Sequence, residues 1–384
     1  MDTYLVGGAV RDELLGLPVK ERDWVVVGAT PGQMRALGFR QVGRDFPVFL
    51  HPETGEEYAL ARTERKSGHG YTGFTVHASP DVTLEQDLAR RDLTINAMAM
   101  TPDGELIDPF NGREDLENGI LRHVSPAFVE DPVRILRVAR FAARFAKWGF
   151  RVAHATNALM RRMVADGEVD YLVPERVWAE LEKALATDSP EVFFQVLRGC
   201  GALAVLFPEI DREYPAAAPA HSGKSLPPAL AALQAAAARS GDTRVRFAVL
   251  LQSLGRDLDR EQRLQQAGAL CQRLKVPNDY RQLALAAIRL EDAARSDDPA
   301  DLLAFLEGAN AFRNPAWFGL LLAVYRAGGW IDENRAALLE RARETAAAVD
   351  TAPFRQQGIE GRALGEALRE ARRQRIAALL EGGG

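Results

Sequence analysis

The spacing of apolar positions changes character at Pro132. Before it, short runs rich in β-branched and aromatic residues predict strands at residues 3–6, 24–27, 48–50 and 57–61. Thr30-Pro31 has the form of a helix start, and Thr83 with Gln86 has the form of a capping box for a helix over 84–91. After Pro132, amphipathic helical periodicity continues almost to the end of the chain. The pattern therefore predicts an α+β protein with an N-terminal α/β head and an all-helical remainder.

Two segments interrupt these patterns. Residues 62–80 are polar and contain three glycines, which predicts a long mobile loop. Residues 214–228, YPAAAPAHSGKSLPP, have the composition of an exposed linker. We therefore expect a head at 1–125, a helical neck at 126–213, a linker at 214–228 and a helical C-terminal domain at 229–384.

Composition changes this picture only locally. The 384 residues are 47% hydrophobic, with neither a signal-peptide pattern nor an apolar run of membrane-spanning length, so we expect a cytoplasmic protein. Cys200 and Cys271 are too few for a disulfide framework and are expected to be small buried residues. The net charge of −5 argues against a globally basic nucleic-acid binder, but residues 122–162 carry nine Arg or Lys against two acids, a balance of +7. That segment is where a polyanion would be held.

The first candidate site is Gly7-Gly8-Ala9-Val10-Arg11-Asp12, followed by Glu21-Arg22-Asp23. A strand that ends in Gly-Gly and enters a helix lets backbone N–H groups approach a phosphate, with Arg11 as a charged clamp. Glu21 and Asp23 stand two residues apart at the start of a predicted strand, so their carboxylates should face the same side. Paired carboxylates suit a hard cation such as Mg²⁺. Taken alone, the glycines also fit a simple turn and the acids a solvated strand end.

In order and spacing, the two segments together resemble motif A of the nucleotidyltransferase superfamily that contains CCA-adding enzymes and poly(A) polymerases. The resemblance implies a polymerase beta-like head in which Glu21 and Asp23 are catalytic metal ligands. It departs from the family at Glu21, where the pair is usually Asp-x-Asp. Residues 87–98 resemble motif B, which assigns nucleotide binding to Arg91, and residues 108–112 resemble motif C, a turn that stiffens the head.

A third segment, residues 130–144, predicts a helix with a basic face. Arg134, Arg137, Arg140 and Arg144 fall within about 120° on a helical wheel, beside an apolar arc that contains Phe141. No acid stands four residues from Arg137, Arg140 or Arg144 to compensate this charge, and a solvated helix face remains the alternative.

Glu130-Asp131-x-x-Arg134 resembles motif D of class II CCA-adding enzymes, in which an Asp and an Arg hydrogen-bond the base of the incoming nucleotide. Cytosine and adenine both present an amino donor beside a ring-nitrogen acceptor, which a carboxylate and a guanidinium match. Uracil and guanine present a carbonyl and an N–H there, so both partners would be left unpaired. The resemblance places Gly8, Arg11, Arg137 and Arg140 on the phosphates or ribose of ATP or CTP, and makes residues 174–183 a structural brace.

The C-terminal third has the surrounding pattern of an HD phosphohydrolase domain, but Gln252-Ser253 stand where that family has His-Asp. No histidine follows His221, which excludes an imidazole-ligated metal site there. We expect a degenerate HD-like domain without phosphohydrolase activity that grips tRNA or dimerises. Arg372, Arg373 and Arg375 would either contact phosphate or only solvate a helix.

The resemblance implies template-independent addition of CMP and AMP, from CTP and ATP, to the 3′ end of tRNA with Mg²⁺, by a monomer or homodimer. A poly(A) polymerase is the nearest alternative; the missing basic tail and the charge of −5 disfavour it. A non-catalytic RNA-binding descendant is the second, favoured only by Glu21. Residues 62–80 are the hypothetical moving element that switches the pocket from C to A.

Overall fold

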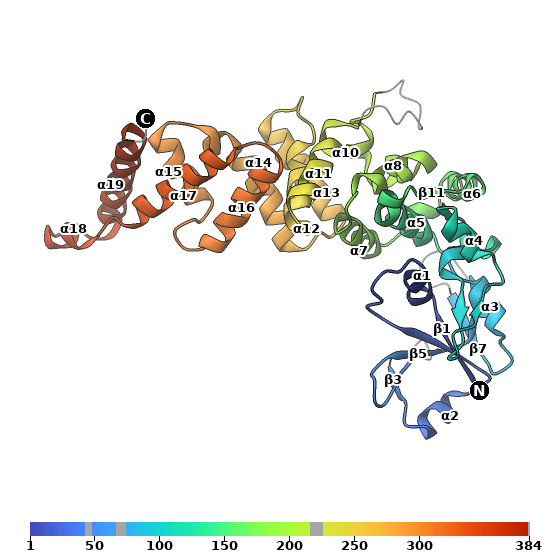
Figure 1. Ribbon diagram of the computed structural model, residues 1–384. Helices are drawn as coiled ribbons and strands as arrows, with labels where there is room; N and C mark the ends of the chain where they lie inside the picture. Colours follow the sequence, from blue (N-terminus) through green and yellow to red (C-terminus); the bar gives the residue numbers. More distant parts are fainter. Residues whose placement is uncertain (43–47, 67–73, 216–225, 383–384) are drawn as a thin grey trace. The chain divides into compact units, whose positions relative to one another are not determined.

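The computed structural model describes residues 1–42, 48–66, 74–215 and 226–382 (Figure 1). It divides into two compact units, residues 1–208 and 209–384. The first unit contains the predicted head and the predicted neck up to residue 208, and residues 209–213 of that neck fall in the second unit. Residues 216–225 of the predicted linker lie outside the described residues.

A seven-stranded sheet organises the first 107 residues. Its strands lie in the order β3-β4-β5-β2-β1-β8-β9. β1 and β2 are antiparallel and β2 and β5 are parallel, with Asp23 of β2 in register with Glu57 of β5. The bounds are β1 Asp2–Val6, β2 Asp23–Val27, β3 Arg40–Val42, β4 Val48–Leu50, β5 Glu57–Leu60, β8 Ala99–Met100 and β9 Leu106–Ile107. The four predicted strands are confirmed, and β3, β8 and β9 are additions.

The alternation of β2 supplies both faces of this sheet with core residues. Val25 packs with Val6 and Leu88 on one face, and Val26 packs with Phe49 on the other. The helices of the head are α1 Gly8–Leu14, α2 Pro31–Ala36 and α3 Leu84–Ala89. The predicted helix start at Thr30 and the predicted capping box at Thr83 are confirmed, and both threonines accept a hydrogen bond from the backbone N–H three residues on.

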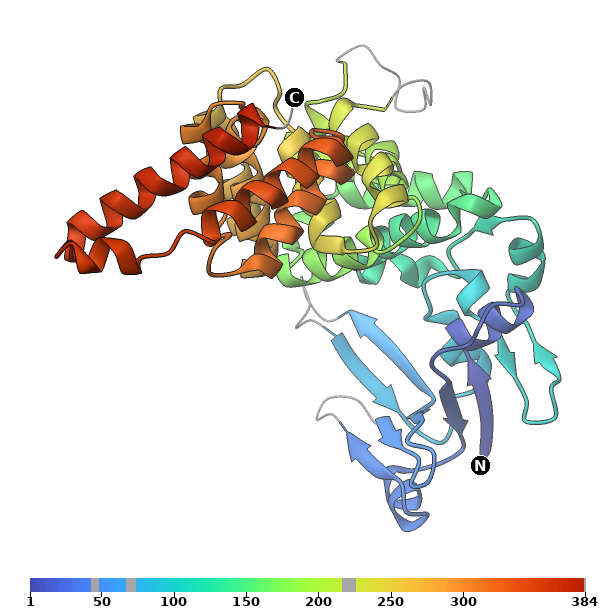
Figure 2. The same cartoon turned by 60° about the vertical axis from the view of Figure 1, so that its left-hand side comes forward.

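The prediction of a loop over residues 62–80 is wrong at both ends. β6 Arg62–Lys66 and β7 Phe74–Ala78 form an antiparallel hairpin, visible as two adjacent strands in Figure 2. Arg62-Thr-Glu-Arg-Lys contains no apolar residue, so hydrophobic alternation gives no strand signal there. Residues 67–73 between the strands lie outside the described residues.

Helix α5, Val133–Phe145, is the centre of the helical part of the first unit and packs against α7 and α8. Ten of its thirteen residues are buried, including Arg134. The remaining elements of this unit are η1 Thr94–Asn96, α4 Gly112–Glu117, β10 Ile120–Leu121, η2 Pro126–Glu130, η3 Ala146–Trp148, β11 Arg151–Val152, α6 His154–Ala165, η4 Glu168–Tyr171, α7 Pro174–Leu185, α8 Glu191–Cys200 and α9 Ala202–Leu206. The short helix α10, Pro208–Asp211, begins at the last residue of this unit and continues into the second. The turn predicted at residues 108–112 is present, because Asp108 accepts the N–H groups of Gly112 and Arg113 where α4 begins.

The second unit is helical throughout its described residues. Its helices are α11 Pro228–Arg239, α12 Thr243–Ser253, α13 Arg260–Arg273, α14 Asn278–Arg295, α15 Pro299–Gly308, α16 Pro315–Ala327, α17 Glu333–Ala347, α18 Ala352–Gln356 and α19 Gly361–Glu381. α12 is the innermost helix, with Val245 to Ser253 all buried against α11, α14 and α16. None of the described helices is both long enough and apolar enough to cross a membrane.

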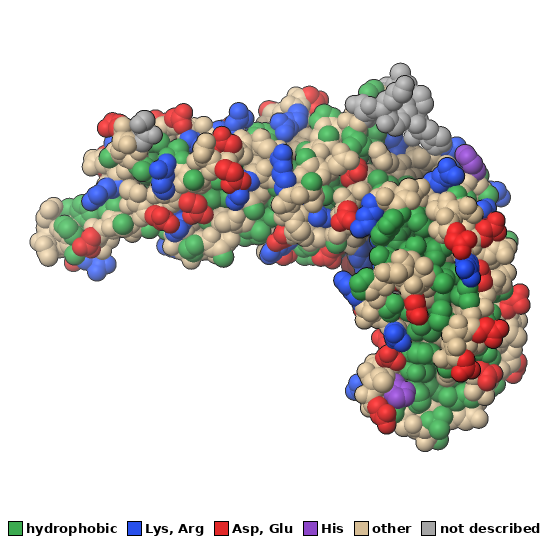
Figure 3. All heavy atoms as spheres, in the orientation of Figure 1, with side chains coloured by type: hydrophobic (Ala, Val, Ile, Leu, Met, Phe, Trp, Pro, Cys, Tyr) green, Lys and Arg blue, Asp and Glu red, His purple; other side chains and the backbone are tan. Residues whose placement is uncertain are grey.

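Charges are interspersed on the visible surface of the second unit (Figure 3). Arg373 pairs with Glu370 at 2.6 Å, and Arg372 lies over the ring of Phe312 at 4.1 Å. Cys200 and Cys271 are buried as predicted, and burial raises the pKa of Cys271 to about 12.

Candidate active site

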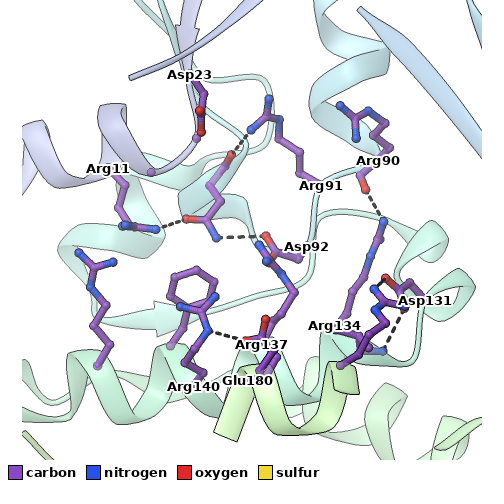
Figure 4. A pocket seen from close by; sticks show the side chains of 18 of the residues that line it. Arg11, Asp23, Arg90, Arg91, Asp92, Asp131, Arg134, Arg137, Arg140 and Glu180 are labelled. Atoms are coloured by element: carbon purple, nitrogen blue, oxygen red, sulfur yellow. Dashed lines mark hydrogen bonds and ion pairs between the residues drawn. The ribbon is translucent and has the colours of Figure 1, made fainter. Parts of the chain in front are cut away.

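One cavity of about 710 Å³ in the first unit brings the predicted site residues together (Figure 4). All nine line it, namely Gly8, Arg11, Glu21, Asp23, Arg91, Asp131, Arg134, Arg137 and Arg140. The lining contains nine arginines and five carboxylates, an excess of four positive charges. Residues from the sheet and from α5 and α7 thus form a single polar cavity suited to a polyanion.

The glycine pair sits at the turn from β1 into α1. Gly7 has φ +70°, and a Cβ there would lie 2.8 Å from Nη1 of Arg91, so the turn and the close approach both require glycine. Gly8 is the first residue of α1 and also lines the cavity. The backbone of this turn therefore forms part of the cavity wall.

Arg11 is a fixed part of this wall. It is 3% exposed, donates through Nε and Nη2 to Oδ1 of Asp12 and through Nη1 to Oδ1 of Asn96, and its guanidinium lies 5.2 Å from the ring centres of Phe141 and Phe145. Burial lowers the pKa of Arg11, and the charge of Asp12 opposes that effect. The clamp expected at Arg11 is thus held rigidly by its neighbours.

The two carboxylates occupy one edge of the cavity, but not both on the strand. β2 begins at Asp23, and Glu21 lies in the exposed segment before it. Burial raises the pKa of Asp23, the charge of Arg91 opposes this rise, and the Glu21 carboxylate adds to it. The two acids are therefore close enough to repel each other. In the described part of the chain, no group of three Asp, Glu, His or Cys side chains is arranged to hold a metal ion.

The arginine row of α5 faces the cavity as predicted, and acids from distant segments compensate it. Arg137 donates to Asp92 at 2.7 Å, Arg140 to Glu180 at 2.5 Å and Arg144 to Asp12 at 2.8 Å. Arg140 also lies 4.3 Å above the ring of Phe141. Three of the four arginines of the row are thus fixed in direction by an ion pair each.

Asp92 is the most strongly perturbed of these acids. Burial alone would raise its pKa, but the charge of Arg137 and hydrogen bonds from Asn96, Arg137 and the N–H of Leu93 lower the pKa of Asp92 to about 2. Asn96 donates to Asp92 and accepts from Arg11, so it connects the glycine turn to α5. Asp92 and Asn96 belong to the segment that resembles motif B, but sequence alone assigned them no role.

The basic pair Arg90-Arg91 follows α3 and is anchored on a buried carboxylate. Arg90 donates to Oδ1 of Asp87 at 2.7 Å and Arg91 to Oδ2 at 3.3 Å. Arg91 also donates to the carbonyl oxygen of Asn96 at 3.4 Å, and burial lowers the pKa of its guanidinium. Its position beside Gly7 and Asp23 puts it between the glycine turn and the carboxylates.

Asp131 and Arg134, the two residues predicted to contact the nucleotide base, each have other partners in the protein. Arg134, 8% exposed, donates through Nη1 to the carbonyl oxygen of Ala127 and through Nη2 to that of Arg90. Asp131 instead receives both terminal nitrogens of Arg176, at 3.1 and 2.8 Å. Arg176 belongs to the segment that sequence analysis treated only as a brace.

In the second unit, Gln252 and Ser253 are buried on α12. Gln252 lies beside a buried ion pair between Arg263 of α13 and Glu291 of α14, and its Nε2 donates to Oε2 of Glu291 at 3.4 Å. At this position, therefore, the described structure has an ion pair and an amide.

Family comparisons match the two parts of the first unit separately. Residues 3–122 match the family described as poly A polymerase head domain, and residues 149–214 match the family described as probable RNA and SrmB-binding site of polymerase A. Over 403 aligned positions, the chain is 55% identical to the multifunctional CCA protein of Thioalkalivibrio sulfidiphilus, with 99% of this chain and 98% of that protein covered. The protein of the same name from Alkalilimnicola ehrlichii is 53% identical over the same shares.

Solved structures have a similar fold. The crystal structure of the Bacillus stearothermophilus CCA-adding enzyme in complex with CTP superposes with a TM-score of 0.66 at 25% identity, over 98% of this chain and 89% of that one. A complex of a CCA-adding enzyme with ATP has a TM-score of 0.67 at 24% identity, over 98% and 86% of the two chains, which supports the fold alone.

Proposed function

Since this chain belongs to the family of the multifunctional CCA proteins, the CCA-adding tRNA nucleotidyltransferases, we propose that it builds the CCA end of tRNA in the cavity described above. The reaction adds CMP, CMP and AMP from CTP and ATP to the 3′ end, and each step releases pyrophosphate. The observation that carries the proposal at residue level is that all nine residues predicted from sequence line one cavity.

Glu21 and Asp23 are the proposed ligands of Mg²⁺. The donor set fits a hard cation, because two carboxylates that repel each other supply oxygen atoms at the cavity edge. When bound, the ion supplies activation of the tRNA 3′-hydroxyl and stabilisation of the departing pyrophosphate.

The arginines hold the nucleotide in our proposal. Arg11, Arg91, Arg137 and Arg140 face the same cavity in fixed directions, which favours a triphosphate over a mobile anion. Attack of the tRNA 3′-oxygen on the α-phosphorus forms one P–O bond and breaks the bond to the β-phosphate.

Base selection is assigned to Asp131 and Arg134 at the other end of α5. Asp131 accepts from the amino group of C or A, and Arg134 donates to the adjacent ring nitrogen. The backbone carbonyl oxygens of Ala127 and Arg90 accept from Arg134 and hold its guanidinium in place at the cavity.

For the second unit we propose tRNA binding or dimerisation without hydrolysis of phosphate esters. The absence of any histidine after His221 in the full sequence supports this. Because tRNA is the substrate, we place the protein in the cytoplasm, as a monomer or homodimer.

The test is incubation of the purified protein and Mg²⁺ with a tRNA that lacks CCA, with CTP alone, ATP alone or both, and product length read on a sequencing gel. We expect CC from CTP and CCA from both, and loss of all extension in Asp23→Asn with unchanged far-ultraviolet circular dichroism. A long ladder of A would identify a poly(A) polymerase, and no extension by the wild type would leave a non-catalytic RNA-binding protein.

A further inference from the structure

The carboxylate of Asp131 is oriented by three donors. Arg176 contributes Nη1 to Oδ1 at 3.1 Å and Nη2 to Oδ2 at 2.8 Å, and the N–H of Val133 donates to Oδ1 at 3.1 Å. A carboxylate has about four lone-pair positions, so these contacts occupy three of them and fix the plane of the group. The side chains of Asp131 and Arg176 are 19% and 28% exposed, so both are largely shielded from solvent.

Arg176 belongs to α7, and the same helix also contacts the arginine row farther along α5, at Arg140. It lies in the first turn of α7, and Glu180, four residues on and therefore on the same face, accepts from Arg140 at 2.5 Å. α7 packs along α5. One face of α7 thus contacts Asp131 through Arg176 and Arg140 through Glu180; Figure 4 labels Asp131, Arg140 and Glu180.

We propose that Arg176 is a positioning residue for base selection, which acts through Asp131. The inference rests on the proposed function and deepens it. With its plane held by the guanidinium fork, Asp131 offers an acceptor in a fixed direction. That acceptor pairs with the amino group of C or A and meets a carbonyl oxygen of U or G, where two acceptors repel.

Without the fork, the carboxylate rotates about its side-chain torsions and can turn away from a mismatched carbonyl. Arg176→Ala is therefore expected to relax discrimination, which a purely structural brace would not do. Charge-assisted hydrogen bonds of this kind predict a fall of about tenfold or more in the ratios of kcat/KM for CTP over UTP and for ATP over GTP. Arg176→Lys keeps the charge without the two-pronged geometry, so its ratios should lie between those of Arg176→Ala and the wild type.

The assay measures single-nucleotide addition by each variant, with all four nucleotides, to tRNA ending before the first C and to tRNA ending in CC. Lys183→Ala is the matched control, because it removes an exposed positive charge from the same helix two turns away. It should retain the wild-type ratios. Thermal unfolding of each variant is recorded in parallel, and Arg176→Lys carries the test if Arg176→Ala does not fold.

A double-mutant cycle decides whether Arg176 acts through Asp131. In an Asp131→Ala background, Arg176→Ala should change the ratios no further. The proposal is overturned if the wild type discriminates but Arg176→Ala lowers kcat/KM equally for all four nucleotides. Failure of the proposed function looks different, because then the wild type itself extends no tRNA.

Discussion

Replacing Glu291 by Gln removes the only charged partner that the described structure gives the buried guanidinium of Arg263. The two side chains are 5% and 7% exposed and join α14 to α13 through two contacts, one of them 3.2 Å between Nη2 and Oε2. Gln252 of α12 completes the cluster, because its backbone carbonyl oxygen accepts a hydrogen bond from Arg263 and its side-chain amide donates one to Glu291. The substitution keeps the size of the side chain but leaves a positive charge in a dry interior.

Breaking a buried ion pair by removal of one partner costs about 3–5 kcal/mol of unfolding free energy. The same two helices provide a control, because Arg260 and Asp292 form a pair at 3.1 Å whose side chains are 52% and 78% exposed. Loss of that pair in Asp292→Asn should cost only about 0–1 kcal/mol. For a unit of this size, where 1 kcal/mol shifts Tm by about 2–4 °C, Glu291→Gln should lower Tm by roughly 10 °C.

Thermal unfolding followed by circular dichroism at 222 nm compares wild type, Glu291→Gln, Asp292→Asn and the double variant Arg263→Met/Glu291→Leu. The double variant removes both charges and should be more stable than Glu291→Gln alone. If Glu291→Gln and Asp292→Asn lower Tm equally, burial does not govern the strength of this pair and the reasoning fails.

Three further predictions concern the first unit. Asp92→Asn should cost about 2 kcal/mol of unfolding free energy at pH 7, because the pKa of Asp92 is about 2 in the folded protein, below the ordinary 3.8. This contribution is complete above about pH 5 and is lost as the pH falls towards 2. Urea denaturation from pH 7 to pH 2 checks it, and a constant difference between variant and wild type would contradict it. Gly7→Ala should raise KM for CTP and ATP because its Cβ displaces Arg91, whereas Gly16→Ala, with a similar φ of +67° and no atom within 4 Å, should not; equal KM values would refute the close approach. Shortening of the segment 62–80 should abolish A addition and spare CC addition on a sequencing gel, and persistent A addition would reject the switching hypothesis.

Local sequence patterns predicted the elements whose signals are local. Runs such as Trp24 to Val27 alternate between the two faces of a buried sheet, and the capping box at Thr83 satisfies backbone groups within three residues. β6 escaped prediction because a strand without apolar residues is defined by its partner, Phe74–Ala78, and hydrophobic periodicity cannot find a partner.

Local sequence patterns also identified the candidate site residues, but they did not identify the contacts that those residues make. Asp131 and Arg134 were identified from a five-residue pattern, which assigned both to the nucleotide base and said nothing of their partners in the protein. In the structure, Asp131 accepts hydrogen bonds from Arg176, 45 residues away, because α7 packs along α5 and brings that guanidinium to the carboxylate. Spacing within one helix cannot report which neighbouring helix supplies the counter-charge.

The acids that pair with the arginine row also come from other elements, so spacing along α5 could not predict them. Arg137, Arg140 and Arg144 find their acids 45, 40 and 132 residues away in sequence, so no helical i, i+4 pattern could reveal them. Each of these three arginines has one acid, and the cavity lining as a whole still has four more arginines than carboxylates, in a chain whose net charge is −5. Mutual repulsion would splay an uncompensated row, whereas full compensation would leave no field for a triphosphate. The fold thus brings distant acids to fix the directions of Arg137, Arg140 and Arg144 and still leaves an excess of positive charge in the cavity lining, which are the two properties that the proposed triphosphate site needs.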